Sequence, residues 1–422
     1  MPVGDHPSTL ATDDELAVGR LATRLLAAPE VQGEAASVAE LWASALGAKL
    51  GTLTGQDRTT LAPAVQELAF AYAQKAANAD AARPKVAWIE APPHQWSGEQ
   101  VPGGRYAADN PDTIYRVAPL DCDSTYRVDG RFVGARPATT VWQVVTDPNV
   151  LSPVANLDGR DLPVAADGSF SVTVGPGRAD GATTHLQTAP EVKGLFIRDT
   201  LSDWATETPP AMSVTRLDGP PVQRRAHDEL VDDTVRMLRS AAKLWIDFYI
   251  IGSLFAPGPN EVPAPVAGPG GIYRSSGNFD LAGDDALVVT LDPVGSAYVS
   301  LVVQNVWSIT PAYWAHQSSL TGHQAVPEAD GTYTFVVSAR DPGVHNWVET
   351  VGLARGTFLA RWQGLPVAAT ATPAITGQVV PLADLRDGLP AGTLVVTAAQ
   401  RAAQLEARRA AFLRRATPAG AR

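Results

Sequence analysis

The chain has almost no cysteine and an excess of negative charge. Cys122 is the single cysteine among 422 residues, which excludes an intramolecular disulfide framework and a cysteine-rich metal site. The 33 Lys and Arg residues against 44 Asp and Glu residues give a net charge of -11. Because phosphate groups bind to basic faces, this balance argues against a nucleic-acid or anionic-membrane partner.

Long hydrophobic runs are also missing. No uncharged apolar run reaches the roughly 18 residues that a membrane-spanning helix needs, and the longest candidate contains Lys243 and Asp247. We therefore expect that candidate to be a buried helix. The N-terminus lacks a basic segment followed by an apolar one, so no signal peptide and a cytoplasmic location are expected.

Nucleotide and metal motifs are absent from the sequence as well. There is no Rossmann-type glycine fingerprint, no phosphate-binding P-loop and no G-x-S-x-G nucleophile elbow. His316 and His323 are seven residues apart on an expected loop, a spacing that does not bring two ligands to one metal. We expect no cofactor and no metal, and we do not expect a dehydrogenase or a kinase.

The pattern of the chain changes twice along its length. An alanine-rich region begins with Thr12 followed by three acidic residues, which is a typical helix N-cap and first turn. Short alternating runs separated by Gly, Pro, Asp and Asn then predict antiparallel strands of a sandwich or barrel. The expected regions are helical 1–83, β 84–223, a connecting helix and Pro/Gly-rich loop 224–271, β 272–393, and a C-terminal helix and tail 394–422.

Two helices stand apart from the β regions. In the segment from Asp228 to Gly252, apolar residues recur at three- and four-residue steps, which predicts one long helix docked against a sheet. Two β regions around one helix also suggest a duplicated architecture. The C-terminal helix carries five arginines, including Arg401, Arg408 and Arg415, and we interpret it as a solvated or subunit-contacting tail.

Segments in both β regions resemble a known group of bacterial proteins. DNPDTIYRVAPLD at 109–121 and DGTYTFVVSARDPGVHNWVETVGLARGTFLARWQ at 330–363 are similar to the domain-of-unknown-function families 1254 and 1214, as is the segment 195–219. The resemblance implies jelly-roll-like antiparallel β-sandwiches with helical additions and an activity that is uncharacterised for most members. The chain departs from the commoner form where VETVG follows its Asn-Trp turn.

The strongest candidates for chemistry lie in the first of these segments. Asp109 and Asp112 could act as general acid or base, and Asn110 could bind substrate. In a strand beginning near Thr113, Tyr115 and Arg116 point to opposite faces, and they could orient a substrate or stabilise charge. The alternative is that both aspartates bond backbone N–H groups in an Asx-turn.

A second group of candidates comes from the other β region. His345 could titrate near neutral pH, and Glu349 could be its partner or a base. Asn346, Trp347, Trp314 and Tyr273 are the expected substrate-binding residues, although Asn346 and Trp347 could equally form an ordered turn and a core contact.

Two other acidic stretches have simpler interpretations. LDCDSTY at 120–126 predicts a hairpin turn between two strands. RDTLSDWATE at 198–207 predicts surface ion pairs.

Together these features favour a cofactor-independent enzyme that uses carboxylate acid/base catalysis on a small, largely apolar, oxygenated molecule. Lyase, isomerase, cyclase and hydrolase chemistry all stay open. The alternative is a non-catalytic β-sandwich protein that binds a lipid, a glycan or a partner subunit. A homodimer is the default expectation, because soluble oligomers are most often twofold.

Overall fold

The computed structural model describes residues 9–96, 98–147, 152–177, 184–221, 223–268, 271–366 and 372–416. Its architecture is mainly β, with antiparallel sheets and helical additions, and this confirms the predicted fold class. No helix in these ranges is long and apolar enough to span a membrane. The helices are α1 (Asp13–Leu26), α2 (Pro29–Leu50), α3 (Gly55–Ala77), η1 (Gly159–Asp161), α4 (His227–Leu244), η2 (Trp245–Leu254), α5 (Leu385–Gly388) and α6 (Ala398–Ala416).

The strands fall into two successive groups along the chain. The first group is β1 (Ala87–Ile89), β2 (His94–Trp96), β3 (Glu99–Val101), β4 (Thr113–Pro119), β5 (Thr125–Arg131), β6 (Thr139–Val145), β7 (Pro153–Asp158), β8 (Ser169–Gly175), β9 (Thr184–Gln187), β10 (Gly194–Thr200) and β11 (Ala211–Asp218). The second group is β12 (Val266–Gly268), β13 (Ile272–Asp280), β14 (Asp285–Asp292), β15 (Tyr298–Gln304), β16 (Ser319–Thr321), β17 (Tyr333–Ser338), β18 (Trp347–Glu349), β19 (Arg355–Gln363) and β20 (Ala374–Pro381).

Each group forms a sandwich of one five-stranded and one four-stranded sheet, and the two sandwiches share one topology; β2 and β3 of the first group pair separately. The five-stranded orders are β1-β4-β10-β6-β7 and β12-β13-β19-β15-β16. The four-stranded orders, β11-β5-β8-β9 and β20-β14-β17-β18, also correspond, and each has a single parallel pair at the same end. The two halves of the chain are therefore duplicated in architecture, and β10 and β19 occupy equivalent central positions.

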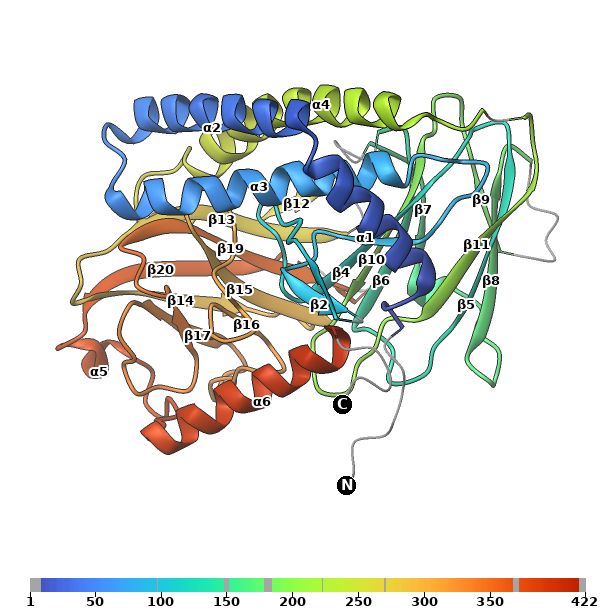
Figure 1. The fold of residues 1–422 in the computed structure, drawn as a ribbon. Coiled ribbons are helices and arrows are strands. Elements are labelled where there is room, and N and C mark those ends of the chain that lie inside the picture. Colours follow the sequence, from blue (N-terminus) through green and yellow to red (C-terminus); the bar gives the residue numbers. More distant parts are fainter. Residues whose placement is uncertain are drawn as a thin grey trace.

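A helical layer covers one side of the molecule. Figure 1 shows α2, α3 and α4 together along one side, with α6 on the opposite side. α3 begins with a capping box in which the Thr54 hydroxyl accepts from Asp57 N–H while the Asp57 carboxylate accepts from Thr54 N–H. Trp42 of α2 donates from Nε1 to the Ala242 carbonyl at 2.9 Å and stacks on Trp307 with ring centroids 6.2 Å apart.

The helix expected over residues 228–252 differs from its prediction in two ways. It becomes a π-helix, η2, at Trp245, and its buried residues Leu238, Ala242 and Ile246 lie in one core with α2 and α3. The prediction that its apolar face docks mainly against a sheet is wrong. An apolar stripe shows that a face is buried, but it does not show which element covers that face.

The C-terminal helix is not the solvated tail that its charge suggested. Arg401, Arg408 and Arg415 are buried, and Phe412 belongs to the same core as Trp204. Arg408 donates to the Tyr313 carbonyl at 2.5 Å and to the Ser319 carbonyl at 3.0 Å. Arginine can be buried when carbonyl oxygens accept from its donors. The number of arginines in a helix therefore does not show that the helix is solvated.

Candidate functional site

Each five-stranded sheet carries an arginine on the outer face of its central strand. In β10, Ile197 points into the first sandwich core, so its neighbour Arg198 points to the opposite face, beside Tyr115 of β4. In β19, Trp362 points into the second sandwich core, and Arg361 points away from it. The two arginines therefore lie on the outer faces of equivalent strands.

These outer faces belong to the contact region between the sandwiches. Gln363 of β19 accepts from the Thr139 hydroxyl at 2.8 Å and from the Thr200 hydroxyl at 3.2 Å. Both threonines lie on strands of the first sandwich, β6 and β10. Polar residues on the central strands thus connect the two halves.

An amine, a phenol and a carboxyl group form a buried chain beside this region. Lys75 of α3 donates from Nζ to the Tyr106 hydroxyl at 3.0 Å, and Tyr106 also interacts with Glu90 through a hydrogen bond. The Lys75 ammonium lies 4.6 Å from the centre of the Tyr72 ring and 5.1 Å from that of Tyr106. Lys75 and Tyr106 are buried, and Glu90 is partly buried.

Burial moves the pKa values of Lys75 and Glu90 toward neutral pH. Burial lowers the pKa of Lys75 from 10.5 to about 8, against the opposing effect of Glu90 and Asp147. Burial raises the pKa of Glu90 from 4.5 to about 7, although Lys75 and Arg198 favour its charged form. A carboxyl and an amine with these pKa values are suited to exchange protons at neutral pH.

A cleft leads from the surface to Lys75. It has a volume of 540 Å³ and lies between α3, α4 and the first sandwich. Val117, Met237 and Leu244 supply apolar lining, while Asp147 and Arg236 are charged lining residues. Half of its lining residues are apolar and half are polar or charged, and its volume is that of a small-molecule site.

Unusual backbone conformations surround the buried chain. Glu90 has φ of 58°, and Ala107 and Ala108 have φ of 52° and 61°, in the left-handed region that disfavours residues with side chains. The adjoining η2 is a π-helix that carries Tyr249, whose pKa burial raises. Such conformations cost energy and occur often at functional sites.

The aspartates at 109 and 112 have specific buried partners. Asp109 is 2% exposed and accepts from Thr310 N–H at 2.8 Å. Burial raises its pKa to about 6, against the opposing effect of Arg105. Asp112 accepts from Trp204 Nε1 at 2.9 Å and from the Tyr298 hydroxyl at 2.7 Å, and burial raises its pKa too.

This segment therefore connects the halves of the molecule. Asn110 makes the Asx-turn, because its Oδ1 accepts from Asp112 N–H at 3.2 Å, and its Nδ2 donates to the Tyr298 hydroxyl at 3.1 Å. The alternative in which the two aspartates themselves form the Asx-turn is wrong, because Asp109 accepts from the distant Thr310 N–H instead. Neither Asp109 nor Asp112 lines the cleft at Lys75.

Tyr115 and Arg116 point to opposite faces of β4, as its alternation predicted. Tyr115 packs near Phe196, with ring centroids 5.8 Å apart, and is close enough to Glu90 and Arg198 for both to affect its pKa, which burial raises. Arg116 forms a fully buried ion pair with Asp199 and donates to the Pro210 carbonyl at 2.7 Å. The surface ion pairs expected around Asp199 are thus a buried structural pair.

The candidates in the second β region do not contact Lys75, Tyr106 or Glu90 in any of the contacts described below. His345 contacts the Gln324 carbonyl at 3.1 Å and Gln404 at 2.9 Å. Asn346 donates to the carbonyls of Val326 and Thr334, and Trp347 packs in a small core of the second sandwich. These contacts match the ordered-turn and core-contact alternative for Asn346 and Trp347.

The last three candidates are also separated from one another. Glu349 lies 3.1 Å from His316 Nδ1 rather than beside His345. Trp314 packs on Phe412 of α6, and Tyr273 packs against the core of the second sandwich. The structure therefore does not bring the two predicted groups of residues into one pocket.

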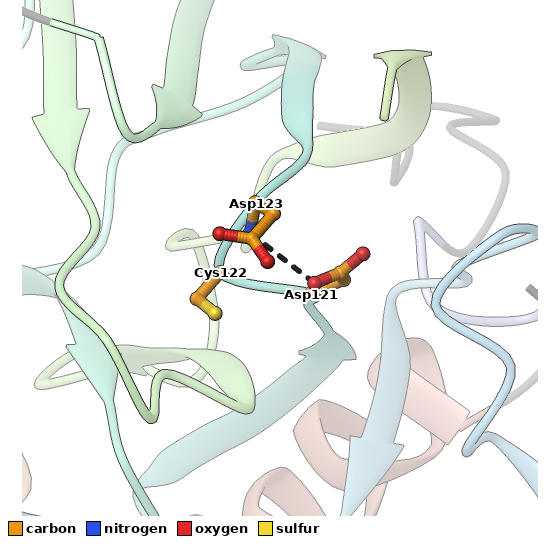
Figure 2. A group of neighbouring side chains, drawn as sticks. All are labelled: Asp121, Cys122 and Asp123. Atoms are coloured by element: carbon orange, nitrogen blue, oxygen red, sulfur yellow. Dashed lines mark hydrogen bonds between the residues drawn. The ribbon is translucent and has the colours of Figure 1, made fainter. Parts of the chain in front are cut away.

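The acidic turn at 121–123 is drawn in Figure 2. In the described part of the chain, Asp121, Cys122 and Asp123 form the one group of three potential metal ligands, with ligand atoms within 4.8 Å of one another. Asp121 accepts from Asp123 N–H at 3.2 Å and from the Ser124 hydroxyl at 2.9 Å, which are ordinary turn contacts. The turn joins β4 to β5, which lie in different sheets, so the predicted hairpin is wrong.

The sequence carried weak signals for the residues that were missed. Lys75 lies three positions after Tyr72 on an apolar helix face, where a charge is unusual. Glu90 directly follows the buried strand β1, and Tyr106 opens the segment that contains the aspartates. Nothing in their spacing showed that the three residues meet.

One comparison with a solved structure supports the fold. An uncharacterised protein from Burkholderia cenocepacia has a similar structure, with a TM-score of 0.69 and 23% identity, over 86% of this chain and 99% of that one. A protein from Vibrio parahaemolyticus matches with a TM-score of 0.42 and 13% identity, over 64% of this chain and 89% of that one. No family model and no curated protein matches the chain, so the resemblance to families 1254 and 1214 stays a prediction.

Proposed function

We propose that the protein is a cofactor-independent acid/base enzyme for a small, largely apolar, oxygenated molecule that binds in the cleft at Lys75. The observation that supports this most is the Lys75–Tyr106–Glu90 chain at the cleft, with its 3.0 Å Lys75–Tyr106 hydrogen bond. Lys75 is the catalytic residue, because it lines the cleft. Tyr106 and Glu90 are positioning residues that act through it.

The chain suits reversible removal of a proton from a bound molecule. The neutral Lys75 amine accepts a proton from the substrate. The Tyr106 hydroxyl then accepts a proton from the Lys75 ammonium and donates its own proton to the ionised Glu90 carboxylate. The reverse transfer returns a proton to the product. This exchange serves isomerisation, and it also serves elimination when a leaving group departs with the electron pair.

Activity should depend on pH through Lys75. Burial holds its pKa near 8, so the neutral amine becomes the main form above that pH. We expect kcat to rise as the pH passes through about 8. Tyr106→Phe breaks the chain without changing the shape of the cleft and should reduce kcat by roughly a hundredfold or more, the usual contribution of proton transfer.

A turnover screen tests the proposal. Wild type, Tyr106→Phe and Glu90→Gln are incubated with small ketones, esters, epoxides and hydroxy acids, and products are measured by mass spectrometry. Asp123→Asn, an exposed change in the acidic turn, is the matched control. Loss of turnover in both chain variants but not in the control supports the proposal. Full turnover in both, or tight binding without turnover of any compound, contradicts it and favours a binding protein.

We further propose a cytoplasmic homodimer, which rests on the sequence expectations given above. The family resemblance is a proposal of the same kind. Sedimentation of the purified chain tests the dimer, and a single species at the monomer mass contradicts it.

A further inference from the structure

Arg198 and Arg361 differ from the buried arginines Arg105 and Arg116 in their partners. Arg105 and Arg116 are each paired with a carboxylate, from Glu67 and Asp199 respectively. Arg198 and Arg361 have no carboxylate within ion-pair distance among the described residues. A buried donor without an acceptor is costly, so a guanidinium that lacks both a carboxylate and an acceptor for one of its donors indicates a place for a ligand that accepts.

Arg361 is the more completely enclosed of the two. It is 7% exposed, and its Nη2 donates to the Ala108 carbonyl at 2.8 Å. Its Nη1 has no hydrogen-bond partner among the described residues. The left-handed backbone at Ala108 places that carbonyl against the guanidinium, which fixes the direction of the remaining donor.

Arg198 has a similar arrangement on the equivalent strand. It donates from Nη2 to Gln143, and its Nε has no partner among the described residues. Gln143 is itself held by Asn156, with 2.7 Å between Nε2 and Oδ1. Each guanidinium is therefore oriented by one neutral oxygen and keeps one buried donor.

The surroundings of both arginines overlap. Tyr115 is close enough to both guanidiniums for each to affect its ionisation, and Glu90 interacts electrostatically with Arg198. Phe196 lies under Arg198, with its ring centre 5.2 Å from Cζ, so the setting is aromatic as well as cationic. Asp112 interacts electrostatically with Arg361, so each guanidinium has a carboxyl group in its wider surroundings but none within ion-pair distance.

We propose that Arg198 and Arg361 bind the carboxylate of a small organic acid between the two sandwiches. Each oxygen of the carboxylate accepts from the free donor of one guanidinium, and hydrogen bonds between charged groups are stronger than those to a neutral oxygen. Neither arginine lines the cleft at Lys75, so this acid is a second ligand and not the molecule proposed to bind in that cleft. Binding of the acid does not depend on catalysis.

Calorimetric titration with sodium hexanoate tests the site. We expect saturable binding to the wild-type chain and at least about tenfold weaker binding in Arg361→Gln and in Arg198→Gln. Arg131→Gln, an exposed change on β5, is the matched control and should bind like wild type. Glu90→Gln removes the neighbouring negative charge and should tighten binding at pH 8.

Several results would overturn the carboxylate site. Equal affinity in wild type and both arginine variants, binding of phosphate but not hexanoate, or no binding at millimolar concentration each contradict it. Thermal unfolding of every variant shows whether lost binding reflects lost folding. Hexanoate binding that depends on the two arginines, without turnover of any compound, supports this site and contradicts the proposed function. Turnover that depends on Tyr106, without hexanoate binding that depends on the arginines, supports the proposed function and contradicts this site.

Discussion

Asp112 should hold the two halves of the molecule together, and replacing it should destabilise the fold. Its side chain is fully buried and accepts from Trp204 at 2.9 Å and from Tyr298 at 2.7 Å. Asp112→Ala leaves both donors without this acceptor. The change tests whether the segment around Asp112 has a structural role.

The magnitude follows from the partners that survive. Trp204 Nε1 loses its acceptor in the alanine variant, which costs about 2 kcal/mol for a buried donor. Tyr298 can still donate to the Ser300 hydroxyl at 2.6 Å, so the loss of its hydrogen bond to Asp112 costs about 1 kcal/mol. We expect the free energy of unfolding to fall by about 3 kcal/mol, and by about half as much in Asp112→Asn, which keeps one oxygen.

Urea titration followed by tryptophan fluorescence measures this change. The matched control is Asp123→Ala, whose exposed side chain should leave the free energy of unfolding within about 0.5 kcal/mol of wild type. A loss below about 1 kcal/mol in Asp112→Ala would refute the structural role. It would return Asp112 to the list of catalytic candidates.

Two further changes test burial elsewhere in the fold. Burial raises the pKa of Glu15 from 4.5 to about 8, so the unfolded chain releases this proton at lower pH and stability falls as the pH rises from 4.5 toward 8. Glu15→Gln should therefore add on the order of 2 kcal/mol at pH 8 and little at pH 4.5 in thermal unfolding; an equal effect at both contradicts the shift. Gly356→Ala should lower stability by about 2 kcal/mol or more, because the added Cβ would lie 2.2 Å from the Gln304 carbonyl oxygen; an unchanged melting temperature contradicts that contact.

The sequence predicted the local elements better than their partners. The N-cap at Thr12 and the two-face alternation of Tyr115 and Arg116 depend on neighbouring residues, and both are present. The hairpin at 120–126 was wrong because a short acidic turn fits a link between sheets as well as a link within one. Turn chemistry fixes the reversal of the chain, and tertiary packing decides where the next strand pairs.

The sequence alone could predict only part of the candidate site. The sequence singled out the segment at 109–116, but it could not show that its aspartates contact partners 186 and 201 residues away. Lys75, Glu90 and Tyr106 come from a helix, a strand end and a loop, and no periodicity joins them. Burial, which sets their proton affinities, is a property of the whole fold.

The protonation of Lys75 tests the proposed proton-transfer chain most directly. The sequence holds five lysines, so carbon-13-labelled lysine gives a spectrum that Lys75→Arg can assign, with the exposed Lys49 and Lys243 as internal references. We expect the Lys75 signal of the folded protein to titrate near pH 8. Titration near 10.5, the ordinary lysine value, would contradict the proposal that Lys75 exchanges protons at neutral pH.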